Sequence, residues 1–342
     1  MWLFFTLFFS YSISYSWTNT YKKNITDLIG KKDTSYIWEQ KDTKSFTQLI
    51  FSWNGIRPRS GYIKFEGQVR DAQTKKWHPW HEMIHWGCGI QKSFFSAHTD
   101  GSAYSHVRLE TTAGKLADAF RIRITVHNKA KLHQLAYLFA ATHNKELFKT
   151  EHPQDYYQDY PSTVIRGVKG ISQKKVDHED ALTICSPTSL CMLTSYIKQE
   201  ELSPIDFANS VYDQTLKIYG NWLFNVAYAF EASDKKAFFY VTRLASFAKL
   251  YGLLKRNIPV VVSVRGAIKG APQSYPGGHL LIVIGYNAKT KSVICHDPAV
   301  LEHYETLKEY QLVDFLPAWE RSHRLAYRAE PYRSKEKLDE KN

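Results

Sequence analysis

The sequence is short of cysteine and of long apolar runs. Only four cysteines occur among 342 residues (Cys88, Cys185, Cys191 and Cys295), which is too few to scaffold a chain of this length with disulfides. The presence of a single disulfide is not decided by the sequence, since an exported protein can hold one. No segment reaches the roughly 18 consecutive apolar residues that mark a membrane-spanning helix, so we expect none.

Acidic residues are in the minority. Lys and Arg total 45 against 33 Asp and Glu, which gives a formal net charge of +12. This charge favours an acidic partner, and a basic solvated surface is the simpler alternative. That partner could be an acidic glycan or a cell-envelope surface, and we expect no nucleic acid. The hydrophobic share of 44% allows packed cores, and the length suits two domains.

The first 16 residues read MWLFFTLFFSYSISYS. The apolar run from Trp2 to Phe9 is too short to span a bilayer as a helix. Ser14 and Ser16 have the spacing of a signal-cleavage site, although a basic segment before the apolar run is missing. We therefore expect a signal peptide and a secreted or cell-envelope (periplasmic or extracellular) protein, with a buried N-terminal strand as the alternative.

Residues 47–143 have the pattern of β-strands. The segments SGYIKFEGQVR at 60–70 and AFRIRITVH at 119–127 alternate between apolar and polar residues. In the second, the apolar residues from Phe120 to Val126 share one face and two arginines share the other. Gly, Asn, Asp and Pro interrupt the region at short intervals, which is typical of an antiparallel β-sandwich.

The C-terminal half has a different pattern. PTSLCMLTSYIK at 187–198 has helical spacing, with Pro187 well placed in the first turn. A second helix is expected from Leu244 to Arg256. Apolar strands are expected at 260–264, 279–286 and 292–296. Helices followed by a sheet indicate an α+β domain.

Cys185 stands directly before Ser-Pro-Thr, at the start of the first expected helix. The N-terminus of a helix carries partial positive charge, which stabilises a thiolate and lowers the pKa of the thiol. A nucleophilic cysteine needs such a placement. On this signal alone, a buried structural cysteine is the more common case.

His279 opens a buried apolar run directly behind Gly277 and Gly278. A polar ring at the start of a buried strand is unusual, and the two glycines leave room for another chain to approach. A core histidine with satisfied hydrogen bonds is the alternative.

Asp297 follows the next apolar segment. The residues between the two segments, YNAKTKS at 286–292, predict a turn. A hairpin centred near Ala288 places His279 directly opposite Asp297 with both side chains on one face, and His296 on the other. An aspartate in that position fixes the tautomer of the imidazole and supports its protonated form.

Gln173 lies twelve residues before Cys185. A glutamine amide upstream of the nucleophile can donate a hydrogen bond to a developing oxyanion. A solvent-facing glutamine is the more common case.

Together these segments resemble the C39-like family of cysteine peptidases, in the subgroup with an N-terminal β-domain. The segments that carry the resemblance are ISQ at 171–173, CSPTSLCM at 185–192, GNWLFNVAYA at 220–229, VTRL at 241–244, IPVVVSV at 258–264, GAP at 270–272, GGHLLIVIGY at 277–286 and HDPA at 296–299. The N-terminal half resembles the group more loosely. Leu223 stands where the family pattern has Pro, and His296 where it has Asn.

The resemblance implies a papain-like fold with the nucleophile at Cys185, the base at His279, the third member at Asp297 and the oxyanion donor at Gln173. It implies no metal or organic cofactor. We therefore expect an exported cysteine peptidase that hydrolyses a peptide or protein substrate at an amide bond through a thioester. A cell-wall amidase or acyl transferase with the same triad, and a non-catalytic glycan- or partner-binding protein, are the alternatives.

The expected organisation of the chain has six parts. They are a signal peptide (1–16), an N-terminal segment (17–46), a β-sandwich domain open to carbohydrate or partner binding (47–143), a linker (144–165), a C39-like catalytic domain (166–330) and a charged tail (331–342).

Two features of the N-terminal half suggest other chemistry. His81, Glu82 and His85 match the zinc-protease pattern H-E-x-x-H, which works only on a helix. Pro79 before the motif and glycines after it disfavour a helix, so an aromatic-rich β-turn is the simpler interpretation.

Tryptophans are the second such feature. They cluster at Trp53, Trp77, Trp80 and Trp86. Exposed tryptophan rings can stack on sugars, and core packing is the alternative.

Overall fold

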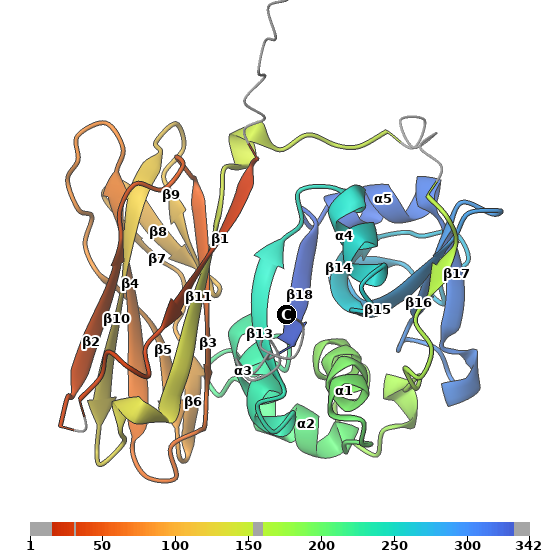
Figure 1. The fold of residues 1–342 in the computed structure, drawn as a ribbon, viewed down its shortest axis with the longest axis horizontal. Coiled ribbons are helices and arrows are strands. Elements are labelled where there is room, and N and C mark those ends of the chain that lie inside the picture. Colours follow the sequence, from red (N-terminus) through yellow and green to blue (C-terminus); the bar gives the residue numbers. More distant parts are fainter. Residues whose placement is uncertain (1–15, 31, 153–159, 332–342) are drawn as a thin grey trace, which may run out of the picture.

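The computed structural model describes residues 16–30, 32–152 and 160–331. All but Ser16 of the expected signal peptide, and all but Pro331 of the expected tail, lie outside the described residues. Two packed β-sheets form the N-terminal half, and a third sheet with helices forms the C-terminal half (Figure 1). The fold is α+β, as expected. Among the described residues, no helix is both long and apolar enough to cross a membrane.

The N-terminal half is a sandwich of two antiparallel sheets. The strands of the first sheet, in spatial order, are β1 (Thr18–Asn24), β11 (Leu135–His143), β3 (Gln48–Gly55), β9 (Arg108–Thr111), β8 (Ser102–Ser105) and β7 (Ala97–Thr99). Those of the second are β2 (Ser35–Gln40), β10 (Ala117–His127), β4 (Tyr62–Asp71), β5 (His81–Gly87) and β6 (Ile90–Ser93). Period-two patterning produces this arrangement, since Phe120, Ile122 and Ile124 of β10 are all fully buried.

The C-terminal half is built on one antiparallel sheet. Its strands, in spatial order, are β13 (Ala237–Arg243), β18 (Leu325–Pro331), β14 (Val260–Gly266), β15 (Tyr275–Asn287), β16 (Ser292–His296) and β17 (Leu307–Gln311), with β12 (Thr163–Val164) paired to β15. Its helices are α1 (Cys185–Lys198), α2 (Pro204–Val211), α3 (Trp222–Ala232), α4 (Phe247–Leu254) and α5 (Leu312–Glu320). Short 3₁₀ turns occur at η1 (Leu132–Gln134), η2 (Lys145–Leu147), η4 (Gln173–Lys175) and η5 (His303–Glu305).

Polar caps set where these helices begin. Asn221 accepts hydrogen bonds from the backbone N–H groups of Leu223 and Phe224 and so starts α3. Ser246 caps α4 in the same way, which is why α4 begins at Phe247 rather than at the expected Leu244. The first helix, α1, extends two residues beyond the expected start and thereby takes in Cys185.

The central sheet separates α1 from α5 (Figure 1). Ser263 of β14, which pairs with Leu280, hydrogen-bonds Ser322 just after α5 through their hydroxyls, 3.2 Å apart. The neighbouring residue His279 faces α1 instead, because side chains alternate along a strand. The start of β15 therefore presents a histidine to the N-terminal end of α1.

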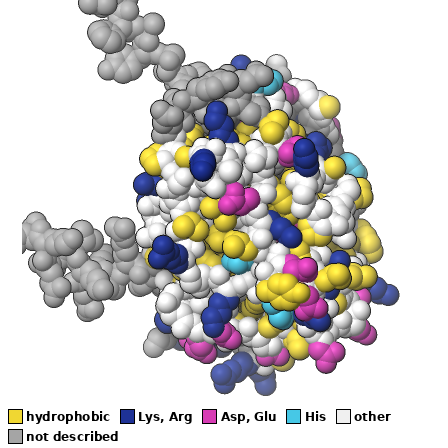
Figure 2. Space-filling view, turned by 90° about the vertical axis from the view of Figure 1, so that its right-hand side faces the viewer, with side chains coloured by type: hydrophobic (Ala, Val, Ile, Leu, Met, Phe, Trp, Pro, Cys, Tyr) yellow, Lys and Arg dark blue, Asp and Glu magenta, His cyan; other side chains and the backbone are white. Residues whose placement is uncertain are grey.

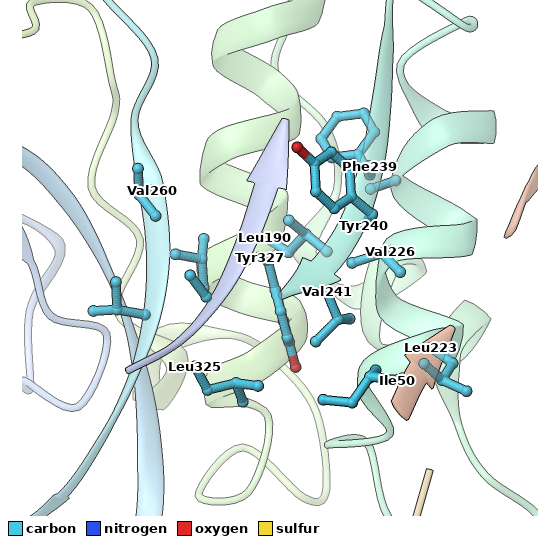
Figure 3. Packing of buried hydrophobic residues seen from close by; sticks show 14 of the residues in the cluster. Ile50, Leu190, Leu223, Val226, Phe239, Tyr240, Val241, Val260, Leu325 and Tyr327 are labelled. Atoms are coloured by element: carbon cyan, nitrogen blue, oxygen red, sulfur yellow. The ribbon is translucent and has the colours of Figure 1, made fainter. Parts of the chain in front are cut away.

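The two halves share one core. Buried apolar side chains of both form a single continuous cluster. Ile50 of β3 lies beside Leu223 of α3 and near Val241 of β13 (Figure 3). Trp53 meets Phe224 edge-on at 6.2 Å between ring centroids. The sandwich is thus packed directly on α3 and β13.

Candidate active site

Cys185 is the first residue of α1. Its backbone N–H is one of the donors that a helix leaves without an intrahelical partner. The side chain is partly exposed, whereas Cys191 and Cys295 are buried. Burial acts to raise the pKa of the Cys185 thiol, but a hydrogen bond from His279, the charge on that ring and a backbone hydrogen bond from Leu280 outweigh it and lower the pKa. The site therefore favours a thiolate.

His279 connects Cys185 to Asp297. Its Nε2 lies 2.8 Å from Oδ1 of Asp297, which leaves Nδ1 for the hydrogen bond with the thiol of Cys185. Burial acts to lower the pKa of His279, but the carboxylate of Asp297 and the sulfur of Cys185 raise it to about 9. The ring is thus held as an imidazolium at neutral pH.

Asp297 directly follows β16 and is fully buried. Its Oδ1 also accepts the backbone N–H of Ala299 at 2.9 Å. Burial acts to raise its pKa, but the charge and hydrogen bond of His279, together with the donors Ala299 and Tyr310, lower the pKa to about 2. The carboxylate is therefore ionised across the neutral range.

The hydrogen bond between His279 and Asp297 is present, but the expected register is wrong. Ile282 pairs with His296, so the next position opposite Asp297 is Leu281, two residues from His279. The turn lies between Asn287 and Ser292, and β15 carries a bulge. An error of two residues keeps a side chain on the same face of the sheet. The two side chains therefore meet diagonally instead of directly.

The glycines before His279 leave the room that their small size predicts. A Cβ at Gly277 has no described atom within 4 Å, so no other chain segment is packed there. Gly278 has a φ of +98°, a backbone conformation that side chains disfavour. The pair thus sets the direction in which β15 begins and leaves the space above Gly277 open.

Two tyrosines, which no local pattern in the sequence signals, complete the surroundings of Asp297. The hydroxyls of Tyr275 and Tyr310 each donate to Oδ2 of Asp297 at 2.7 Å. Burial, followed by the charge on Asp297, raises the pKa of both hydroxyls, so both stay protonated donors. Strand pairing alone brings Tyr310, on β17, to this carboxylate.

Gln173 lies next to this group of residues. Its backbone N–H donates to the carbonyl of Pro298, the residue after Asp297, at 2.9 Å. Its side chain is buried, and Nε2 donates to the carbonyl of Ala181 at 3.0 Å. The side-chain amide is therefore bound to the segment that leads into α1, and the backbone of Gln173 to the segment that follows β16.

The zinc-protease pattern is not on a helix or in a turn. His81 and His85 lie in strand β5, where a rise of about 3.3 Å per residue separates positions four apart by about 13 Å. Nε2 of His81 lies 3.0 Å from the hydroxyl of Ser102, while Nε2 of His85 lies 2.7 Å from Glu82. Two residues so far apart cannot share a zinc ion. Within the described residues, no group of three or more His, Cys, Asp or Glu side chains is placed to hold a metal.

The four tryptophans divide into two pairs. Trp53 and Trp86 are fully buried in the sandwich core. Trp77 and Trp80 are partly exposed and lie against guanidinium groups, with Arg121 3.9 Å from the Trp77 ring centroid and Arg123 4.2 Å from that of Trp80. Core packing therefore accounts for only half of the cluster.

Comparison with known proteins gives the class of the C-terminal half. Residues 165–327 match the Peptidase_C39 like family. This segment is a C39-like cysteine peptidase domain, preceded by an all-β region of antiparallel sheets. The family match covers the C-terminal half of the chain and assigns this class to that half.

Two solved structures are similar to about half of the chain. A C39-like peptidase from Bacillus anthracis has 18% sequence identity and a TM-score of 0.38, over 52% of this chain and 100% of that one. Xylellain, a cysteine protease from Xylella fastidiosa, has 9% identity and a TM-score of 0.33, over 54% of this chain and 91% of that one. None of the curated proteins matches the chain.

Proposed function

We propose that the protein cleaves peptide bonds with Cys185 as nucleophile, His279 as proton carrier and Asp297 as the group that orients and charges the imidazole. The observation that carries this proposal is the continuous hydrogen-bonded path from Asp297 through His279 to a cysteine at the start of a helix. A thiolate beside an imidazolium is the reactive form of a nucleophilic cysteine.

The reaction proceeds in two steps. The Cys185 thiolate attacks the carbonyl carbon, a C–S bond forms and the carbonyl oxygen takes the negative charge. The His279 imidazolium gives its proton to the nitrogen as the C–N bond breaks, which releases the amine and leaves a thioester. A water molecule then gives a proton to His279 and attacks the thioester, and breakage of the C–S bond restores the thiolate.

Two donors are available for the oxyanion in this scheme. One is the backbone N–H of Cys185, which α1 leaves without an intrahelical partner. The other is the side-chain amide of Gln173, fixed in the neighbouring segment. Fixed donors at a developing charge supply much of the rate enhancement in acyl transfer.

Exposed apolar side chains near the site suit a peptide with apolar residues. Leu182 is 75% exposed just ahead of α1, and Leu301 and Tyr304, 65% and 83% exposed, follow Asp297 closely in sequence. On the side of the C-terminal half that carries β17, apolar side chains lie exposed among charges of both signs (Figure 2).

Export is also part of the proposal. It is supported by the apolar run Trp2 to Phe9 and by the small residues Ser14 and Ser16. Trp17 is packed in the fold: its ring contacts Phe148 and its Nε1 donates to the carbonyl of Ala245. Cleavage after Ser16 keeps all of these contacts.

An unbiased cleavage screen tests the activity. The wild type, Cys185→Ala and Cys191→Ala are incubated with a peptide library and, separately, with peptidoglycan. Cys191 is a matched control because it is a buried cysteine of the same helix. We expect peptide cleavage by the wild type and by Cys191→Ala, and none by Cys185→Ala. Release of peptide from peptidoglycan alone indicates an amidase, and cleavage that survives Cys185→Ala contradicts the proposal.

A further inference from the structure

The carboxylate of Asp297 is held on both oxygens. Oδ1 accepts from His279 and from the backbone of Ala299, at 2.8 and 2.9 Å. Oδ2 accepts two hydroxyls, those of Tyr275 and Tyr310, each at 2.7 Å. Both tyrosines are buried. A carboxylate with both oxygens engaged cannot rotate without breaking several short hydrogen bonds at once.

Tyr275 touches the imidazole as well. Its ring stacks on that of His279, with centroids 4.1 Å apart and planes 12° apart. The same side chain therefore covers one face of the imidazole and binds the carboxylate that orients it. Tyr310 reaches the carboxylate from β17, and no ring contact joins it to His279 among the described residues.

We propose that Tyr275 and Tyr310 are positioning residues of the active site: together they aim Oδ1 of Asp297 at His279, and Tyr275 also fixes the plane of the His279 ring. This inference rests on the proposed roles of Cys185, His279 and Asp297. It assigns the two tyrosines a share in keeping the Cys185–His279 pair in its reactive form.

The pH dependence of Cys185 reactivity follows from the effect of these hydrogen bonds on the pKa of Asp297. A hydroxyl that donates to a carboxylate stabilises the charged form and lowers its pKa. Loss of a hydroxyl therefore raises the pKa of Asp297, so that Asp297 takes up a proton at higher pH on acidification. The His279 imidazolium then loses its partner, and the thiolate of Cys185 is lost at a higher pH as well.

Other titratable groups also lie near Asp297. They are Cys185 on α1, Cys295 on β16 and Lys308 on β17, which interacts with Cys295. Cys295 is buried with a raised pKa, so it stays a neutral thiol. His296 hydrogen-bonds the hydroxyl of Thr306 through Nδ1, 3.0 Å away. Neither Cys295 nor His296 replaces the tyrosine hydroxyls as a donor to Oδ2 of Asp297.

The test compares four variants by the rate at which a thiol-alkylating reagent modifies Cys185 between pH 3 and pH 8. Tyr275→Phe removes one hydroxyl and keeps a stacked ring, Tyr310→Phe removes the other, and Tyr275→Leu removes both the hydroxyl and the ring. Tyr251→Phe is the matched control, because Tyr251 is also buried and its hydroxyl donates to the carbonyl of Pro161 at 2.9 Å, elsewhere in the domain. This readout needs no knowledge of the substrate.

The acid arm of the alkylation profile is the pH range in which the rate of Cys185 alkylation falls on acidification. We expect Tyr275→Phe and Tyr310→Phe each to shift this acid arm to higher pH, by about half to one pH unit. Where a substrate is in hand, kcat per titrated site falls about tenfold, with KM little changed. Tyr275→Leu has the larger effect, because the ring contact is lost too. Tyr251→Phe leaves the profile in place.

The outcomes separate this inference from the proposed function. If Cys185 of the wild type is alkylated no faster at low pH than Cys88, Cys191 or Cys295, the proposed function fails. If the wild type reacts fast and both phenylalanine variants keep its acid arm, the tyrosines are structural only and this inference is overturned. Reduced activity of these variants with an unchanged acid arm also overturns this inference.

Discussion

The side-chain amide of Asn54 pairs with the backbone of Phe239 as a neighbouring strand would. Nδ2 donates to the carbonyl of Phe239 at 2.9 Å, and the N–H of Phe239 donates to Oδ1 at 2.8 Å. Ser52 accepts the N–H of Val241 in the same way, at 3.1 Å. Since β13 is the edge strand of the C-terminal sheet, the sandwich closes an edge that otherwise stays open to pairing with other chains.

Asn54→Ala is therefore expected to destabilise the whole chain. The substitution leaves a buried N–H and a buried carbonyl of Phe239 without partners, which costs about 2 kcal/mol of unfolding free energy. Asn287→Ala is the control, because Asn287 bonds Glu309 near the surface, and about 0.5 kcal/mol or less is expected there. Urea unfolding measures both. Equal stabilities of the two variants would contradict the edge-closing role.

The pH dependence of stability is expected to report the His279–Asp297 pair. In a Cys185→Ala background the thiolate is absent, so the carboxylate dominates the pKa of His279. A histidine whose folded pKa lies above its unfolded value of about 6.5 stabilises the fold fully below that pH, and loses the contribution as pH rises through the folded pKa. With Cys185 present that pKa is about 9, and the Cys185 sulfur is one cause of the rise, so in the Cys185→Ala background the loss lies within roughly pH 6.5 to 9.

The measurement is urea unfolding of Cys185→Ala and of Cys185→Ala with His279→Gln at pH 6 and pH 9.5. The stability gap between the two variants should shrink at the higher pH, by on the order of 2–3 kcal/mol. Asp297 is ionised at both pH values because its pKa is about 2. It therefore does not contribute to the change, and an unchanged gap would show that His279 is not charged.

The sequence predicted the secondary structure near the site well, and the reasons are local. A period-two pattern predicted β10 in the sandwich, a short apolar run predicted β14, and Pro187 with helical spacing predicted α1. Cys185, His279 and Asp297 stood out as candidates because Cys185 begins a helix, His279 opens the apolar run within β15 and Asp297 directly follows β16. Local patterns of this kind depend on few neighbours.

Features that depend on long-range pairing could not be predicted. The turn is centred between Lys289 and Thr290 instead of near Ala288, and a bulge in β15 brings the register back by one residue. Tyr275 and Tyr310 are 35 positions apart in the sequence and meet only because β15, β16 and β17 are adjacent. β1, the first strand of the sandwich, pairs with β11, the last. The sequence of neither strand indicates this pairing.

Cys185 is expected to be the most reactive of the four cysteines at pH 6. An ordinary thiol has a pKa of about 8.5 and is mostly neutral at that pH, while the pKa of Cys185 is lowered by His279. Burial raises the pKa of Cys191 to about 12. Mass spectrometry after brief alkylation compares all four residues in one sample. His279→Ala should slow the labelling of Cys185 markedly and Asp297→Asn less, and equal labelling of all four would contradict an assembled pair.

The exported protein is expected to begin near Trp17. N-terminal sequencing of material recovered outside the cytoplasm checks this directly. Replacing Leu7 and Phe8 with Asp interrupts the apolar run and should leave the chain inside the cell with Met1 intact. An intact Met1 on soluble cytoplasmic wild type would rule out the signal peptide.

Gln173 is expected to act on the oxyanion and not on the thiolate. Gln173→Ala removes the amide, so kcat should fall about 100-fold, while the backbone bond to Pro298 is unaffected by the side chain. Because the thiolate depends on His279, alkylation of Cys185 at pH 6 should keep its wild-type rate. A peptide aldehyde forms a tetrahedral adduct whose oxygen needs the oxyanion donors, so its affinity should fall with kcat. The contrast between the two reagents also separates this role from a structural one, since Nε2 of Gln173 anchors Ala181 and a displaced segment would slow alkylation too. If alkylation slows as much as catalysis, or if the aldehyde binds the variant as tightly as the wild type, Gln173 is not an oxyanion donor.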